Sequence, residues 1–177
     1  SRETLNGTRK STELARAREL RQFAESADFL LDIHSTSLPA PAMLLCGSRE
    51  KGRILAAKMG YPFHVVADIG HTSGVRLRDF GAFNNGASAK SSVLVECGQH
   101  FDKNSPTVAL KSIVAFLKAC GMLDDTPEQF PALPRRRGQK FIEVSHAITI
   151  RSDGFAFSRE FRCFETIAKA GTRFAQD

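Results

Sequence analysis

The sequence predicts an α/β fold, a mixed sheet flanked by helices, followed by a small and incomplete β domain. Three observations predict this organisation. Helical patterns alternate with short apolar runs over residues 1–123, as in a sheet with helices on its faces. Prolines and arginines crowd residues 124–138, which indicates a linker. Short β-type runs flank Asp153-Gly154 within residues 139–177, which predicts a hairpin in a partial β-rich C-terminal domain.

The first half of the chain alternates regularly between helix and strand. Ser11 can cap a helix that ends at Ser26 and has apolar residues at helical spacing. The apolar run over residues 29–34 predicts a strand covered on both faces, as in a parallel sheet. Three further elements follow, a buried strand, a helix stopped by a glycine and a third strand, over residues 42–46, 49–59 and 63–67.

A long polar stretch that is rich in glycine, residues 69–91, separates these elements from the next strand. Loops of this length inside a domain are usually functional or disordered. A fourth strand is predicted over residues 92–97 and broken by Gly98. Ser105-Pro106 then provides a cap and a first-turn proline for a helix that ends before Gly121.

Composition excludes several classes of protein. The 177 residues are 42% hydrophobic and 25% charged, which excludes a disordered chain. Four cysteines without paired spacing exclude a disulfide framework and suit a reducing, cytoplasmic compartment. No run approaches the ~18 apolar residues of a membrane helix. The net charge of +6 permits an anionic partner, but the arginine run over residues 135–137 favours a solvated linker over a nucleic-acid site.

The first candidate site is Asp32-Ile33-His34, at the end of a predicted strand. Ligands of α/β proteins bind beyond the carboxyl ends of the strands. Because side chains alternate along a strand, Asp32 and His34 point to the same face, where the carboxylate can orient the imidazole of a metal ligand. A histidine that only hydrogen-bonds to a neighbouring carboxylate gives the same pattern.

The second candidate is Glu96, which ends the apolar run over residues 93–95. Burying a carboxylate is costly unless it has a partner or a function. Beside a metal-bound water, a partly desolvated glutamate of raised pKa can act as a general base. A structural ion pair to a loop is the alternative. We expect the same edge of the sheet to bring Glu96 and His34 together.

The third candidate is the loop that contains His71, Arg76 and Arg78, which we expect to bind substrate. Its glycines let the backbone approach a ligand, and either arginine can hold a carboxylate in bidentate fashion. A surface loop with solvated arginines is the alternative.

The first two candidates also carry a family resemblance. Asp32-Ile33-His34-Ser35-Thr36 and the run over residues 94–100, Leu-Val-Glu-Cys-Gly-Gln-His, resemble the succinylglutamate desuccinylase/aspartoacylase family of zinc carboxypeptidase-like deacylases. The helix around residues 13–21 and the β-rich segment after residue 138 are also similar to members of that family. The resemblance spans most of the chain.

The resemblance implies a zinc-dependent hydrolase that cleaves the amide bond of an N-acyl amino acid or a similar small amide. It implies that His34 is a zinc ligand, with Asp32 behind it, and that Glu96 activates the zinc-bound water. Family substrates are often anionic, which an arginine clamp from Arg76 or Arg78 would fit. The expected partner is therefore a small anionic acyl amide, and we expect binding to neither nucleic acid nor membranes. Homo-oligomerisation and the identity of the acyl group and of the amine stay open.

The sequence departs from the family in its metal ligands. The family holds zinc with a His-x-x-Glu pair and a later histidine, but no His-x-x-Glu precedes His34, and the substrate-binding Asn-Arg motif is not visible either. One histidine cannot hold catalytic zinc. We expect both motifs upstream of Ser1, so that residues 1–123 form a catalytic-type domain without its N-terminal part. Loss of the metal is the alternative.

Two other functions stay open. The first is a carboxypeptidase-like peptide hydrolase, because the same zinc chemistry cleaves either kind of amide. The second is a metal-free module that binds acidic small molecules through the basic loop.

Overall fold

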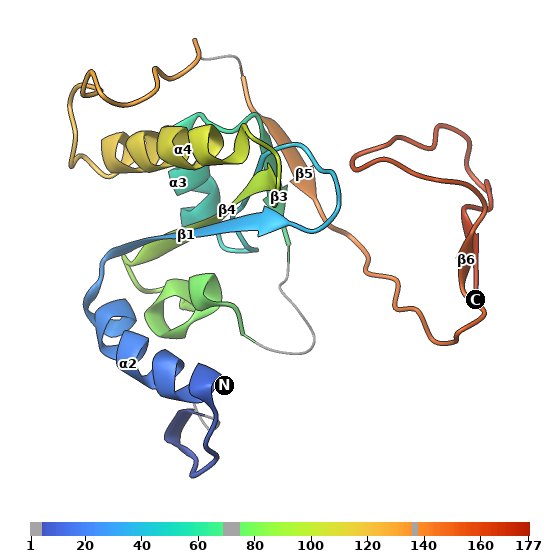
Figure 1. Ribbon diagram of the computed structural model, residues 1–177, viewed down its shortest axis with the longest axis horizontal. Helices are drawn as coiled ribbons and strands as arrows, with labels where there is room; N and C mark the ends of the chain where they lie inside the picture. The colour runs from blue at the N-terminus through green and yellow to red at the C-terminus, as the bar shows by residue number, and fades with distance from the viewer. Residues whose placement is uncertain (1–4, 69–74, 136–137) are drawn as a thin grey trace.

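The computed structural model describes residues 5–68, 75–135 and 138–177, and a five-stranded sheet forms its centre (Figure 1). The strands lie in the order β1-β4-β2-β3-β5. Their bounds are Phe29–Thr36 for β1, Met43–Leu45 for β2, His64–Ala67 for β3, Ser91–Gln99 for β4 and Lys140–Glu143 for β5. Every neighbouring pair is parallel except β2 and β4, which are antiparallel. The predicted mixed sheet flanked by helices is therefore confirmed.

Helices α2 (Thr12–Ser26), α3 (Glu50–Met59) and α4 (Ser105–Ala119) accompany the sheet. The Ser11 hydroxyl accepts a hydrogen bond from the amide of Leu14 at 3.2 Å and so caps α2, as predicted. Gly60 has φ of 64° and ends α3. No helix in the described parts of the chain is long and apolar enough to cross a membrane.

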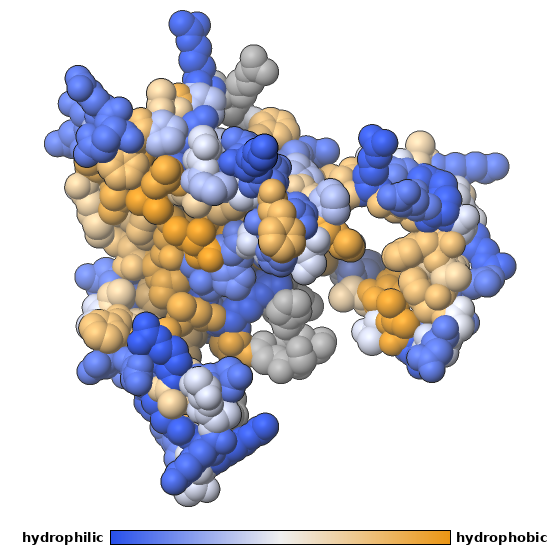
Figure 2. Space-filling model, viewed as in Figure 1, coloured by the Kyte–Doolittle hydropathy of each residue, from blue (hydrophilic) through white to orange (hydrophobic). Residues whose placement is uncertain are grey.

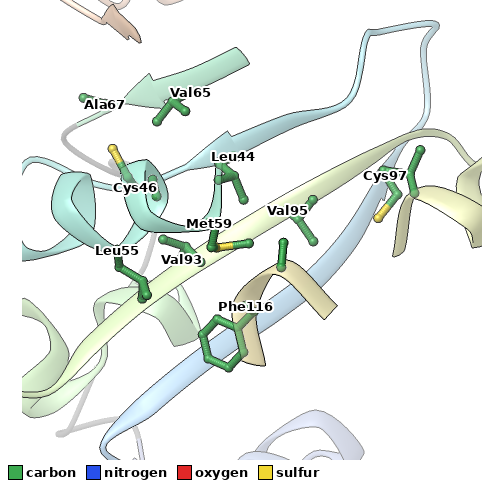
Figure 3. Packing of buried hydrophobic residues seen from close by; sticks show 13 residues of the cluster. Leu44, Cys46, Leu55, Met59, Val65, Ala67, Val93, Val95, Cys97 and Phe116 are labelled. Carbon is green, nitrogen blue, oxygen red and sulfur yellow. The ribbon is translucent and has the colours of Figure 1, made fainter. Parts of the chain in front are cut away.

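The hydrophobic core fills the space between one face of the sheet and the helices α3 and α4 (Figure 3). Val93 and Val95 of β4 point into it, and α4 contributes Phe116. Cys97 belongs to the same cluster, and its burial raises the pKa of the thiol to about 11. A thiol of that pKa stays protonated at neutral pH, so Cys97 packs rather than acts as a nucleophile.

The opposite face of β4 is covered by the segment that follows β3. This segment forms two short 3-10 turns, η1 (Leu77–Asp79) and η2 (Gly81–Asn84). The Ser92 hydroxyl of β4 donates to the carbonyl of Arg78 at 2.6 Å. Leu94, the next residue on this face, is also buried. Glu96 is the first residue of this face of β4 that lies beyond the covered part, and it is half-buried.

The predicted covering of β1 on both faces is wrong. Among the described residues β1 pairs only with β4, so it lies at the edge of the sheet, and Ile33 is 44% exposed. Figure 2 shows hydrophobic surface on the side of the molecule where β1 crosses the view. A mostly apolar run indicates that both faces of a strand carry apolar side chains, but it does not indicate whether neighbouring elements cover them.

The C-terminal region differs from its prediction in two ways. β5 pairs in parallel with β3, so the strand expected to open the β-rich domain at residue 139 belongs to the main sheet instead. The predicted hairpin around Asp153-Gly154 does not form, because residues 147–150 are not a strand and β6 (Ala156–Phe157) pairs with β7 (Ala175–Gln176). In Figure 1 this segment forms an arm beside the sheet. Its Phe164 contacts the ring of His64 on β3, with 4.6 Å between ring centroids.

A substitution at Gly52 can test how closely α3 packs on the sheet. A Cβ at this position would lie 2.1 Å from the carbonyl oxygen of Cys46, the residue that directly follows β2. Alanine normally favours a helix over glycine by about 1 kcal/mol, but here it would push α3 off the sheet. We expect Gly52→Ala to lower the free energy of unfolding by about 2 kcal/mol or more, measured by urea denaturation.

Gly86→Ala is the matched control, because a Cβ at Gly86 would meet nothing within 4 Å. We expect it to change the free energy of unfolding by less than about 0.5 kcal/mol. Equal urea midpoints for the two variants would contradict the close packing of α3.

Candidate functional site

The strand register places His34 and Glu96 side by side. In the parallel pair of β1 and β4, the Cα partner of His34 is Glu96. The neighbours of Glu96 along β4, Val95 and Cys97, point into the core beneath α4, so the Glu96 side chain points to the opposite face. Asp32, two residues before His34, lies on this face too. The structure therefore brings together the first two predicted candidates.

Asp32 holds the imidazole of His34. The Nε2 atom of His34 lies 3.1 Å from Oδ1 of Asp32, and the His34 side chain is 48% exposed whereas that of Asp32 is 16% exposed. A carboxylate accepts, so this contact favours the tautomer with the proton on Nε2 and a lone pair on Nδ1. An oriented, half-exposed imidazole with a carboxylate behind it has the form of a metal-binding histidine.

Glu96 is a carboxylate in a partly desolvated place. Burial raises the pKa of its carboxyl, and Asp32 adds to the increase, whereas the charges of His34, Arg76 and His100 lower it; the net pKa is raised. Its Oε2 atom is buried and has no hydrogen-bond partner among the described residues. A buried acceptor without a partner is costly, and at functional sites such atoms face a group that arrives with the ligand. Glu96 is therefore suited to accept a proton.

The basic loop separates its two arginines into different environments. The side chain of Arg78 is 1% exposed; its Nη1 donates to Asp68 at 2.9 Å and its Nη2 donates to Asp79 at 2.8 Å. The prediction that Arg78 binds substrate does not fit this burial between two carboxylates. The side chain of Arg76 is 19% exposed and donates to the other oxygen of Asp68 at 2.5 Å. Arg76 lies close enough to Glu96 to influence its pKa, so it stays a candidate for binding substrate.

Two other histidines complete the account of this region. His71, the third residue predicted to bind substrate, lies outside the described residues. His100, at the end of β4, is exposed and its Nδ1 lies 2.8 Å from the hydroxyl of Ser35, at the end of β1. His100 lies within the electrostatic reach of Glu96, although the sequence interpretation gave it no role.

The described residues do not complete a zinc site. Residues 5–68, 75–135 and 138–177 contain no group of three His, Cys, Asp or Glu side chains arranged to hold a metal ion. Catalytic zinc takes three protein ligands. His34, supported by Asp32, fits one of these positions, but the described part of the chain does not supply the others.

Comparison with known proteins identifies the fold. No protein-family model and no curated protein matches the chain. Among solved structures, succinylglutamate desuccinylase from Vibrio parahaemolyticus superposes with a TM-score of 0.61 at 17% identity, over 97% of this chain and 53% of that one. Succinylglutamate desuccinylase/aspartoacylase from Rhodobacter sphaeroides gives 0.57 at 20% identity, over 80% and 43%. The chain has the fold of these proteins.

A third solved structure shares this fold. The ectoine utilization protein EutE (DoeB) from Ruegeria pomeroyi superposes with a TM-score of 0.55 at 19% identity, over 85% of this chain and 46% of that one. The chain thus spans about half the length of the structures it resembles. The resemblance that the motifs of β1 and β4 predicted is confirmed at the level of the fold.

Asp68 is a residue of the site region that the sequence interpretation missed. It directly follows β3, and polar residues at strand ends were the signal used for the other candidates. Its interaction with both arginines of the loop could not be read from spacing, because the loop folds back to reach it.

Asp68 provides a prediction about stability. Its pKa is held below the usual value of 3.8 by Arg78 and Arg76, despite burial. A lowered pKa in the folded state means that the stabilisation is complete above pH 3.8 and is lost as pH falls through the folded pKa. We expect Asp68→Asn to lower the free energy of unfolding by about 3 kcal/mol at pH 7, because it leaves buried arginine charge without its partner.

The same measurement at low pH, by urea denaturation, should show a smaller difference between Asp68→Asn and the wild-type protein. Asp125→Asn, at an exposed position of the segment after α4, is the matched control and should change stability by less than about 0.5 kcal/mol at either pH. A difference for Asp68→Asn that is the same at pH 7 and pH 3 would contradict the ion pairs.

Proposed function

We propose that this protein is a deacylase that hydrolyses the amide bond of an N-acyl amino acid or a similar small amide. The observation that carries the proposal is the pair formed by Glu96 and His34. Glu96 has a buried Oε2 without a partner among the described residues, and beside it stands an imidazole held by Asp32. The fold shared with two structures named for desuccinylase activity supports the same reaction class.

In this proposal Glu96 moves the proton. Its carboxylate accepts a proton from the water that attacks the amide carbonyl, and returns this proton to the leaving amine nitrogen. The amide bond breaks, and a carboxylic acid and an amine are released. Because burial raises the pKa of Glu96, the carboxylate is a stronger base than that of an ordinary glutamate.

His34 would bind zinc through Nδ1, with Asp32 holding its ring and with further ligands from outside the described residues. When bound, zinc lowers the pKa of a water molecule to ~7 and polarises a carbonyl group.

Arg76 would bind an anionic part of the substrate. The structures from Vibrio parahaemolyticus and Rhodobacter sphaeroides both carry the name of succinylglutamate, an N-acyl amino acid whose carboxylates an arginine can recognise. Arg76 is partly exposed and near Glu96, so a substrate carboxylate bound there would place the rest of the molecule beside the base.

The proposed base is tested by Glu96→Gln in the full-length protein. We expect kcat for the hydrolysis of N-succinylglutamate to fall about 10²- to 10⁴-fold, while bound zinc is retained, because the amide cannot accept the proton. The wild-type rate should rise with pH along an acidic limb centred above pH 4.5, since the pKa of Glu96 is raised. Glu19→Gln, an exposed glutamate of α2, should leave kcat unchanged. Unchanged turnover in Glu96→Gln would remove Glu96 from the mechanism.

The proposed ligand is tested by His34→Ala, with zinc measured by elemental analysis of the full-length protein. We expect near-stoichiometric zinc in the wild-type protein and loss of most of it in the variant. His146→Ala, an exposed histidine of the C-terminal region, is the matched control and should keep its zinc. A correctly folded full-length protein without zinc would overturn the zinc-dependent reaction and favour a module that binds acidic small molecules.

A further inference from the structure

We infer that Arg78 is a positioning residue, which holds Arg76 beside Glu96 through the Asp68 carboxylate that the two arginines share. The inference rests on the proposed function in one respect only, the use of Arg76 to bind a substrate carboxylate. It replaces the expectation that Arg78 itself contacts the substrate.

The shared carboxylate links the two arginines directly. Oδ1 of Asp68 accepts from Nη1 of Arg78 at 2.9 Å, and Oδ2 accepts from Nη1 of Arg76 at 2.5 Å. The two oxygens of a carboxylate are rigidly connected, so the bond to Arg78 fixes the direction in which Oδ2 points. The position of Arg76 therefore depends on the position of Arg78.

Arg78 is the fixed member of the pair. Its side chain is 1% exposed, and its second terminal nitrogen donates to Asp79 at 2.8 Å. Its carbonyl accepts from the hydroxyl of Ser92, which ties the loop backbone to β4. Gly47, after β2, has φ of 68°, and a Cβ there would lie 3.4 Å from Oδ1 of Asp79 and 3.6 Å from Cζ of Arg78. The guanidinium thus lies within van der Waals range of the Gly47 position, whose positive φ favours glycine.

Arg76 is the more accessible member of the pair. Its side chain is 19% exposed, whereas that of Arg78 is 1% exposed. Its charge also reaches Glu96. An arginine that donates to one carboxylate can donate to a second through another of its N–H groups.

The charges of the cluster explain what removal of Arg78 would do. Two arginines balance two aspartates when all four side chains are present. Without Arg78, the carboxylates of Asp68 and Asp79 would both be left with Arg76 as the nearest cation of the cluster. Arg76 would turn toward them and away from Glu96, and the surplus negative charge would repel a substrate carboxylate.

The functional test compares Arg78→Gln, Arg76→Gln and the double variant in the full-length protein, with N-succinylglutamate as substrate. We expect each single variant to raise KM about tenfold or more while kcat changes less than about threefold, and the double variant to resemble Arg76→Gln alone. Arg78→Lys should lie between, because one ammonium group cannot bridge both aspartates in the geometry of a guanidinium. Misfolding alone would lower the active fraction, and so kcat, without raising KM.

Arg53→Gln is the matched control, since Arg53 forms its ion pair with Glu143 on β5 and not with Asp68 or Asp79. It should leave KM unchanged. A normal KM in Arg78→Gln together with a raised KM in Arg76→Gln would overturn the inference. A KM of the double variant that equals the product of the two single increases would overturn it too.

A second test does not need activity. In protein labelled with ¹⁵N-arginine, the guanidinium signals of Arg76, assigned by their loss in Arg76→Gln, should shift in Arg78→Gln and stay in place in Arg53→Gln. Unshifted Arg76 signals in a folded Arg78→Gln protein would overturn the positioning role. If the protein hydrolyses no acyl amide, the proposed function fails, whereas these signals still decide the role of Arg78.

Discussion

The parallel pairing of β1 with β4 is the constraint on which the site depends. One register sets His34 opposite Glu96 and, two residues earlier, Asp32 on the same face. A shift of this register by one residue would turn Asp32 and His34 to the other face of the sheet. β4 resists such a shift because Val93 and Val95 are locked into the core beneath α3 and α4. The packing on one side of the strand thus maintains the chemistry on the other.

The loop over the second face of the sheet is stabilised in a different way. A buried arginine is costly unless its charge is neutralised and its donors are used. Asp68 and Asp79 neutralise Arg78, and Ser92 fixes its backbone. The loop therefore owes its position to these ion pairs together with the burial of Phe83 in η2, and its hydroxyl contact from Ser92 attaches it near the start of β4.

The sequence predicted well which polar residues gather at the ends of strands, and it predicted poorly the burial and the partners of other residues. The rule that ligands gather at the carboxyl ends of strands was enough to place Asp32, His34 and Glu96 together, because alternation along β1 and β4 fixes the face of each side chain. The burial of Arg78 could not be predicted, because the local sequence around a solvated loop arginine does not differ from that around an arginine enclosed by carboxylates. The Asp153-Gly154 turn misled for a related reason: β6 pairs with β7, about twenty residues further on, and local pattern does not report a distant partner.

The reversed direction of β2 has a consequence for how such a site can change. Because β2 runs against β1 and β4, the connection over residues 37–42 both leaves and re-enters the sheet at the edge where Glu96 and His34 lie. Met43, the first residue of β2, is the Cα partner of Glu96. Insertions and deletions in this connection would reshape the rim of the site while the strand register stays intact. Under the proposed function, selectivity can therefore evolve in these six residues independently of the groups proposed to move the proton.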